Sequence, residues 1–303
     1  KCISADVNCA VDPTFDSVNE KNNAAYLNYG IVVTKYTGSG GKYSTNDAPA
    51  EFVGEIRKIF NDANVVWQTG ELGKVDVGGG GQRNLDHWWA ASGIAMLMAD
   101  FRHQGGTTGS KTAFERTCGN SVIGFNLKKG PEDYYLYHAW TDQLLTLRAA
   151  FEHPCIDPER IAVWGQSQGG GTALMAAALE PRVKKCFAAV PSYSWWERRI
   201  DLKLASAAQL ESYLRDHPAD IPRVFDLMSY FDGMNFAARV KCPVRLYACG
   251  RDTAVTPECV YAVYNHLATS DKSVVDFPYG RHECYLDQYY KWIKELQADW
   301  GIR

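Results

Sequence analysis

The chain has 303 residues, of which 46% are hydrophobic and 13% aromatic, enough to bury one large α/β domain or two small ones. A net charge of −3 without runs of like charge excludes the basic surface that a nucleic-acid partner needs. No apolar stretch approaches the roughly 20 residues that cross a bilayer, and the first residues lack the basic-then-apolar pattern of a signal peptide. We therefore expect a soluble, cytoplasmic protein with neither nucleic-acid nor membrane partners.

Residues 1–81 predict a small βαβ fragment. Residues 29–36 and 65–68 are strand-like, and apolar residues at 52, 53, 56, 59 and 60 form a helical stripe between them. This fragment carries too little apolar material for a sizeable core of its own. The glycine run at 78–81 is the natural boundary, so the predicted domains are 1–81 and 82–303.

Beyond residue 85, strand and helix patterns alternate, which is typical of a mostly parallel sheet with helices on both faces. The apolar run GIAMLMA (93–99) predicts a buried parallel strand. Apolar residues at 140, 144, 147 and 151 mark one face of a helix that ends near His153. The aromatic and charged stretch 192–235 predicts an excursion from the sheet. The remaining expected elements are strands at 161–165, 244–250 and 273–277, and helices after Ser167, from Pro257 and from about Leu286.

Ser167 is the candidate nucleophile. It lies in Gly-Gln-Ser-Gln-Gly (165–169), a G-x-S-x-G motif between a strand and a helix, where glycines give a sharp turn the room it needs. The Gln168 N–H at the helix start is placed to donate to a developing oxyanion. A phosphate-binding turn or simple tight packing are the alternatives, but no phosphate-loop lysine follows and no second fingerprint glycine precedes.

A serine nucleophile needs a base, and three histidines follow Ser167. His217 lies within the excursion and His266 within a predicted helix, so surface or packing roles suit both. His282 lies in a loop just after the strand at 273–277, where a base carried by the sheet is expected. We therefore predict that His282 is the base.

The acid is expected between the serine and the histidine in the sequence. Asp252 follows the strand at 244–250, and the 30 residues to His282 accommodate one helix and one strand. Both side chains would then project from the same edge of the sheet as Ser167. Asp276 and Glu283 are alternatives, but Asp276 lies inside its strand and Glu283 is adjacent to the histidine.

Three motifs carry a resemblance to a known family: Arg-His-Gln at 102–104, Gly-Gln-Ser-Gln-Gly-Gly at 165–170 and His-Glu at 282–283. Residues 82–303 resemble carbohydrate esterase family seven, the acetyl xylan esterases and cephalosporin-C deacetylases, with His103 where that family has glycine. The resemblance implies an α/β-hydrolase fold that forms homo-oligomers. It also implies hydrolysis of acetyl esters on xylo-oligosaccharides, small sugars or cephalosporin C, without metal or organic cofactor.

The resemblance also suggests further site residues. The family has a His-Gly-Tyr-Gly-Gly segment whose tyrosine N–H resembles a second oxyanion donor, and that position corresponds to Gly79 here. Trp195 and Trp196 are candidate walls of the substrate site, although adjacent tryptophans are as often found in core or lid packing. The expected partner is thus a small acetylated substrate.

Residues 1–81 resemble an internal segment of aspartyl aminopeptidase and aminopeptidase I zinc peptidases, through Ser-Ala-Asp at 4–6 and GELGKVDVGGGG. Asp6 corresponds to a metal ligand of that family. A two-zinc site needs further ligands, and no histidine precedes His87, so we expect no metal here. A zinc aminopeptidase-related chain and an inactive hybrid of two incomplete folds are the alternatives to an esterase.

Overall fold

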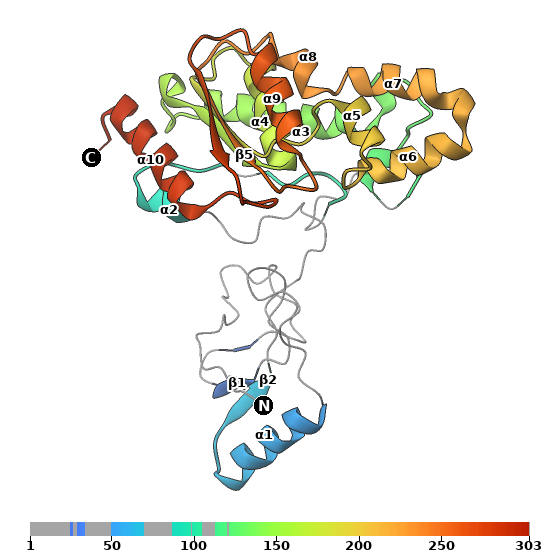
Figure 1. The fold of residues 1–303 in the computed structure, drawn as a ribbon. Helices are drawn as coiled ribbons and strands as arrows, with labels where there is room; N and C mark the ends of the chain where they lie inside the picture. Colours follow the sequence, from blue (N-terminus) through green and yellow to red (C-terminus); the bar gives the residue numbers. More distant parts are fainter. Residues whose placement is uncertain are drawn as a thin grey trace. The chain divides into compact units, whose positions relative to one another are not determined.

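The computed structural model divides into two compact units, Lys1–Val77 and Gly78–Arg303 (Figure 1). It describes residues 25–26, 29–33, 50–69, 87–97, 99–104, 113–119 and 121–302. Over these ranges, no helix combines the length and the apolar character needed to span a membrane.

The first unit contains the expected βαβ arrangement. Strands β1 (Ile31–Val33) and β2 (Trp67–Thr69) pair in parallel, with α1 (Ala50–Asp62) between them in the chain. Of the described residues in this unit, Ala25 alone is buried, and Ile59 of the predicted apolar stripe is 58% exposed. The prediction that this segment has little core of its own agrees with that burial.

The second unit is built on a parallel four-stranded sheet whose strands lie in chain order. They are β3 (Ala162–Gln166), β4 (Lys185–Ala189), β5 (Val244–Cys249) and β6 (Lys272–Phe277). Strands β3, β5 and β6 confirm the expected elements, whereas β4 was not expected. It opens with a lysine, a residue rarely found in buried strands unless its charge is paired.

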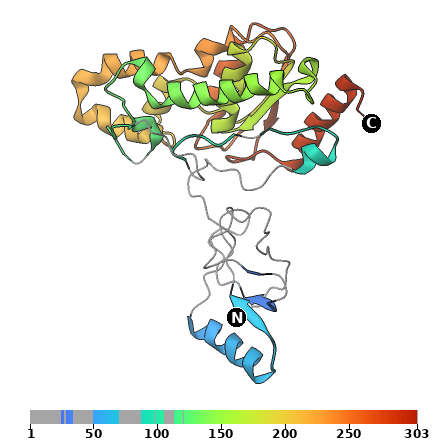
Figure 2. The same cartoon turned by 180° about the vertical axis from the view of Figure 1, so that it is seen from behind.

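Each crossover between these strands runs in the same direction, so right-handed connections place their helices on one face. That face carries α4 (Gln168–Leu179), α8 (Gly233–Ala237) and α9 (Pro257–His266), with α3 (Tyr135–Glu152) packed on α4 (Figures 1 and 2). The helices predicted around Trp140, after Ser167 and from Pro257 are thus confirmed.

The other face is covered by α10 (Leu286–Trp300), which confirms the last predicted helix, and by the short α2 (His87–Ala91). Trp89 stacks on Trp164 of β3, with ring centroids 5.8 Å apart. The ring centroid of Trp292 in α10 lies 5.2 Å from that of Phe187 in β4. The sheet is therefore sandwiched between two helical layers, as the sequence predicted.

The segment between β4 and β5 lies outside the sheet, as predicted, and the structure shows that it is helical. It comprises α5 (Trp196–Asp201), α6 (Ala207–Asp216) and α7 (Ile221–Ser229), which with part of α3 enclose a second hydrophobic cluster. Short 3-10 helices lie at Val122–Gly124, Pro131–Asp133, Pro158–Arg160 and Pro218–Asp220.

The strand predicted at 93–99 is wrong over the residues that the structure describes there. Ile94 and Met96 pack against the core, but Leu97 is 61% exposed and residues 94–97 form no ladder. A buried parallel strand needs hydrogen-bonded neighbours. Within the described residues, β3 pairs only with β4, so this segment has no ladder to join.

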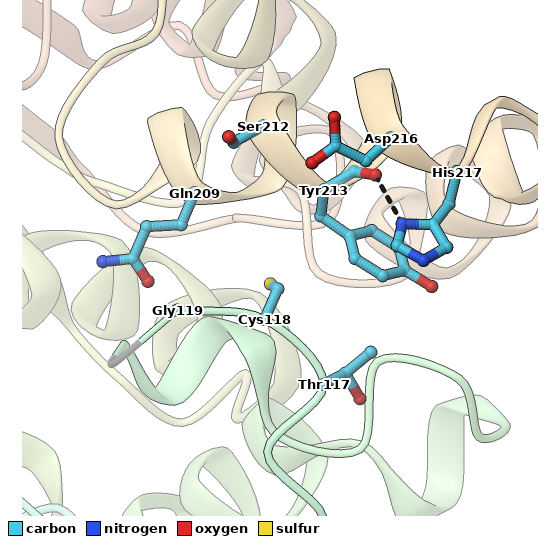
Figure 3. Close-up of a pocket in the computed structure, with 8 residues that line it drawn as sticks. All are labelled: Thr117, Cys118, Gly119, Gln209, Ser212, Tyr213, Asp216 and His217. Atoms are coloured by element: carbon cyan, nitrogen blue, oxygen red, sulfur yellow. Dashed lines mark hydrogen bonds between the residues drawn. The ribbon is translucent and has the colours of Figure 1, made fainter.

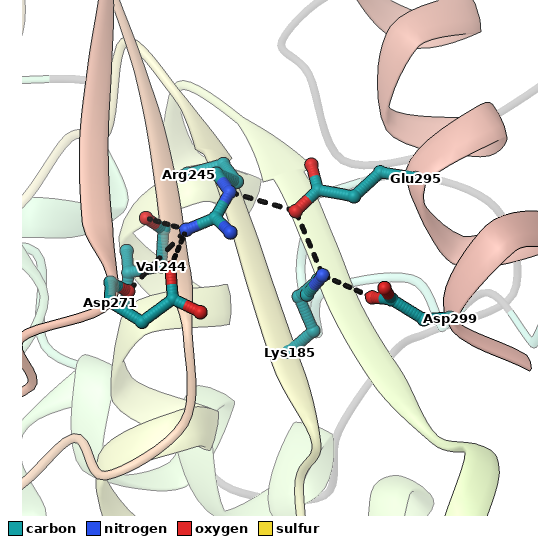
Figure 4. A network of polar contacts seen from close by, with 6 residues as sticks. All are labelled: Lys185, Val244, Arg245, Asp271, Glu295 and Asp299. Carbon is teal, nitrogen blue, oxygen red and sulfur yellow. Dashed lines mark hydrogen bonds and ion pairs between the residues drawn. The ribbon is translucent and has the colours of Figure 1, made fainter.

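An ionic network around the buried Lys185 side chain explains why β4 tolerates a lysine (Figure 4). The Lys185 side chain is 8% exposed and binds Glu295 at 2.8 Å, together with Asp299, both on α10. Glu295 also accepts from Arg245 Nε of β5 at 2.8 Å, and Arg245 binds Asp271 at 2.6 Å. The network ties α10 to two neighbouring strands, and the Arg245 hydrogen bond lowers the pKa of Asp271.

The Arg-His-Gln motif has a structural role. Arg102 binds Asp142 of α3 through two hydrogen bonds of 2.6 and 2.5 Å. The Tyr135 hydroxyl donates to the Arg102 carbonyl at 2.6 Å and accepts from Gln104 Nε2 at 2.8 Å. These contacts fasten the segment to the first half of α3.

Candidate active site

Ser167 occupies a strained turn between β3 and α4. Its backbone has φ 54° and ψ −116°, a conformation that non-glycine residues rarely adopt. A Cβ added to Gly165 would lie 2.2 Å from the backbone carbon of Gly169, so a side chain at 165 would prevent the turn. The Ser167 N–H donates to the Ala189 carbonyl of the neighbouring strand segment at 2.9 Å.

Gly169, the second glycine of the motif, is not needed to give the turn room for a side chain. A Cβ added to Gly169 would meet nothing within 4 Å, whereas one added to Gly171 would lie 2.2 Å from the Ser192 carbonyl oxygen. The close approach of α4 to β4 and the turn after it is therefore at Gly170 and Gly171, and the backbone at Gly169 restricts the residue at 165 to glycine.

Three side chains predicted from the sequence lie together at the carboxyl edge of the sheet. His282 Nε2 is 2.7 Å from Ser167 Oγ, and His282 Nδ1 is 2.7 Å from Asp252 Oδ2. The Asp252 carboxylate is fully buried, and its other oxygen accepts from the Ala254 and Val255 N–H groups at 2.7 and 2.9 Å. The backbone thus fixes the acid, the acid orients the imidazole, and the imidazole faces the serine.

The alternative acids are engaged elsewhere. Asp276 accepts a hydrogen bond of 2.5 Å from the Tyr261 hydroxyl. Glu283 accepts from Tyr285 Oη at 2.6 Å and from the Arg281 N–H at 3.0 Å, and the tyrosine contact lowers the pKa of Glu283. Neither carboxylate binds His282 in the described structure, so Asp252 is the acid that the geometry supports.

The alternative bases are also remote from Ser167. His266 lies 2.7 Å from the Ala262 carbonyl oxygen of its own helix. His217 stacks on Tyr213 with ring centroids 4.4 Å apart and lines a pocket of about 320 Å³ (Figure 3). None of the residues lining this pocket belongs to the Ser167, Asp252 and His282 group: Thr117, Cys118, Gly119, Gln209, Ser212, Tyr213, Asp216 and His217.

Of the two expected oxyanion donors, one is described. Gln168 is the first residue of α4, so its N–H belongs to the set of amides that open the helix beside Ser167. Gly79 lies outside the described residues, as does Asp6. Among the described residues, the Gln168 N–H therefore stays a candidate donor.

The two tryptophans have different environments. Trp196 is 2% exposed, and its indole N–H donates to the Phe231 carbonyl at 2.9 Å, so it packs in the core and does not line a substrate surface. Trp195 is half-buried, with a left-handed backbone at φ 51°. The Asp232 carboxylate accepts hydrogen bonds from the backbone N–H groups of Trp195 and Trp196, each at 2.9 Å. Of the pair, only Trp195 stays a candidate for the substrate site.

Ser192 was not singled out from the sequence. Its Oγ lies 3.2 Å from Ser167 Oγ, and its N–H donates to the Ser167 carbonyl at 2.9 Å. No motif in the sequence marks this residue. Had the strand at 185–189 been predicted, its parallel pairing with β3 would have placed Ser192 near Ser167.

Among the described residues, no group of three or more His, Cys, Asp and Glu side chains is arranged to hold a metal ion. The zinc site implied by the resemblance of residues 1–81 has one candidate ligand, Asp6, and the chain has no histidine before His87. The residues present do not fit a two-zinc site.

Comparison with known proteins separates the same two parts of the chain. Residues 1–87 match the aminopeptidase I zinc metalloprotease (M18) family. The probable M18 family aminopeptidase 1 of Thermotoga maritima is 56% identical over 79 residues, which cover 26% of this chain and 18% of that protein. The chain thus spans less than a fifth of that relative.

The longer part matches esterases. The acetyl esterase Axe7A of Xylanibacter ruminicola is 28% identical over 187 residues, covering 61% of this chain and 41% of that protein. The crystal structure of acetyl xylan esterase 1 from Thermoanaerobacterium sp. JW/SL YS485 matches with a TM-score of 0.66 and 28% identity, over 72% of this chain and 71% of that one. The predicted α/β-hydrolase fold is thereby confirmed. With residues 77–296 matching the family described as acetyl xylan esterase (AXE1), the chain belongs to that family.

Proposed function

We propose that residues 82–303 hydrolyse acetyl esters through a catalytic triad of Ser167, His282 and Asp252. The observation that carries this proposal is the pair of 2.7 Å contacts that His282 makes, one to each partner. Family membership supports the same reaction class. The strained turn at Ser167 is a further support, because such strain is characteristic of a nucleophile elbow.

In the first half of the reaction, Ser167 Oγ attacks the acetyl carbonyl carbon and passes its proton to His282 Nε2. Asp252 accepts the Nδ1–H, which sets the tautomer and stabilises the imidazolium. The carbonyl electron pair moves to oxygen, where the Gln168 N–H and a second donor at Gly79 stabilise the charge. The imidazolium then protonates the leaving sugar alkoxide.

In the second half, water attacks the acetyl-serine. His282 takes the water proton and returns a proton to Ser167 Oγ as acetate leaves. The substrates that suit this chemistry are acetylated xylo-oligosaccharides, small acetylated sugars or cephalosporin C. The half-buried Trp195 is a candidate for one wall of their site. We also propose that homo-oligomers narrow access to the site.

Replacing the proposed nucleophile tests this assignment directly. Ser167→Ala is expected to reduce hydrolysis of 4-nitrophenyl acetate to background, because it removes the hydroxyl proposed to form the acyl-enzyme. Phenylmethylsulfonyl fluoride should add one sulfonyl group to the wild-type chain, as seen by intact mass, and none to the variant. Circular dichroism confirms that the variant is folded. Turnover near the wild-type rate in a folded variant would refute the triad.

A further inference from the structure

A second hydroxyl lies beside the proposed nucleophile. The 3.2 Å between Ser192 Oγ and Ser167 Oγ is within hydrogen-bond distance. Ser192 lies three residues after β4, the strand that pairs with β3, so parallel pairing carries both serines to one edge of the sheet. Through its N–H and its hydroxyl, Ser192 contacts both the backbone and the side chain of Ser167.

The turn that carries Ser192 is strained. Val190, Tyr193 and Trp195 all have positive φ, at 37°, 63° and 51°. Such values are uncommon outside glycine, and for a β-branched residue such as valine they are outliers. Strain of this kind persists only where the surrounding structure enforces it, and it gathers at functional sites. The turn at 190–195 is therefore held in a shape that its residues do not favour.

Contacts on both sides hold this turn. The buried Asp232 carboxylate accepts the backbone N–H groups of Trp195 and Trp196, each at 2.9 Å. On the other side, α4 approaches so closely at Gly171 that an added Cβ would lie 2.2 Å from the Ser192 carbonyl oxygen. The position of Ser192 is thus fixed by the packing of α4 and by a buried carboxylate.

The direction of the serine–serine hydrogen bond follows from the other contacts. A carboxylate only accepts, so His282 Nδ1 carries the proton shared with Asp252, and neutral His282 Nε2 is an acceptor. The single Ser167 hydroxyl proton is then donated to His282 at 2.7 Å. In the contact with Ser192, Ser167 Oγ can only accept, and the Ser192 hydroxyl is the donor.

We propose that Ser192 is a positioning residue for the esterase reaction, donating a hydrogen bond that holds Ser167 Oγ toward His282. This inference rests on the proposed function. As the Oγ–carbon bond forms, the Ser167 proton moves to His282 Nε2 and Ser192 keeps its own proton. The donor stabilises the negative charge that grows on Oγ. In the acetyl-enzyme Oγ is an ester oxygen and a weak acceptor, so Ser192 acts mainly on acylation.

The test is Ser192→Ala in the full chain, with enzyme in excess over 4-nitrophenyl acetate. In this single-turnover regime, release of nitrophenolate measures acylation alone. Loss of one neutral hydrogen bond is expected to slow acylation about three- to tenfold. Ser192→Thr, which keeps a hydroxyl, should restore the rate to within about twofold. Ser192→Cys, a weaker donor of similar size, should fall between the two.

Ser194→Ala is the matched control. Ser194 belongs to the same turn and is fully buried, but its hydroxyl donates to the Pro191 carbonyl at 3.2 Å and not to Ser167. It should leave the acylation rate unchanged. The proposal is overturned if Ser192→Ala acylates within about twofold of wild type, or if Ser194→Ala slows acylation equally. Retained turnover in Ser167→Ala would instead refute the proposed function itself.

Discussion

At the scale of single residues, two of the non-glycine residues with positive φ lie within the sequence motifs of the second unit. Ser167 has φ 54° and His103 has φ 58°. The family glycine that His103 replaces is explained by this left-handed backbone, which glycine adopts without steric cost. The His103 ring packs against Phe114 and Phe125, with centroids 5.3 and 6.5 Å away, and these contacts offset part of the strain.

The two glycines that frame Ser167 should respond differently to alanine. Gly165→Ala places a Cβ 2.2 Å from backbone atoms, so we expect it to destabilise the fold by roughly 3 kcal/mol or more and to abolish activity. Gly169→Ala adds a methyl group where nothing lies within 4 Å, at a helical position. It should change stability by no more than about 1 kcal/mol, in the favourable direction. Urea unfolding of both variants measures this, and equal losses would contradict the account.

At the scale of elements, α4 begins directly after Ser167, the proposed nucleophile, and ends at a buried carboxylate. Glu180 caps the helix and is 4% exposed. Two Arg182 nitrogens bind it at 2.8 Å, and the Arg182 guanidinium lies over the Phe151 ring of α3, 4.2 Å from its centroid. The hydrogen bond from Arg182 is the main reason that the pKa of Glu180 falls to about 2. The carboxylate thereby joins the end of α4 to α3.

This carboxylate should contribute a pH-dependent part of the stability. Because its pKa is lower in the folded chain, its contribution is complete above about pH 4.5 and is lost as the pH falls toward about 2. Glu180→Gln is expected to reduce the free energy of unfolding at pH 7 by about 1–2 kcal/mol, with the difference from wild type shrinking on acidification.

Urea unfolding between pH 7 and pH 3 measures this difference. Glu159→Gln is the matched control, since Glu159 pairs with Lys184 but its side chain is 78% exposed. An exposed pair should contribute less than about 1 kcal/mol. A constant difference between Glu180→Gln and wild type across this pH range would show that the charge of Glu180 is not responsible.

At the scale of the whole molecule, the chain joins segments that match two different families. The two matches overlap at residues 77–87, and the two units divide between Val77 and Gly78. Ser167, Asp252 and His282 all lie in the second unit. The proposed activity therefore needs no side chain from the aminopeptidase-like segment, although the proposed second oxyanion donor, Gly79, lies beside the junction.

Removing metal ions distinguishes the proposed serine esterase from a zinc aminopeptidase. Dialysis of the full chain against EDTA should leave hydrolysis of 4-nitrophenyl acetate unchanged, because the proposed triad uses a serine nucleophile and an imidazole base. The same samples are assayed with an aminoacyl 4-nitroanilide, which reports aminopeptidase activity. Esterase activity that disappears with EDTA and returns with zinc would contradict the proposed mechanism.

Much of the site was predictable because its signals are local. A strand, two glycines and a helix start, all contiguous in the chain, predict the turn at Ser167. Asp252 and His282 each follow a strand that is itself apolar enough to predict. The acid and base could then be placed at one edge, because parallel strands present their carboxyl ends together.

The sequence by itself determined which residues are candidates for the triad, namely Ser167, Asp252 and His282. It also determined the family resemblance of each segment and the α/β pattern. Only the tertiary structure decided that Lys185 opens a central strand, that Ser192 reaches the nucleophile, that Trp196 is core, and that residues 94–97 form no strand. The physical reason is the same in each case. Burial of a charge, a hydroxyl contact and strand pairing all depend on partners contributed by distant segments, and a local pattern does not specify them.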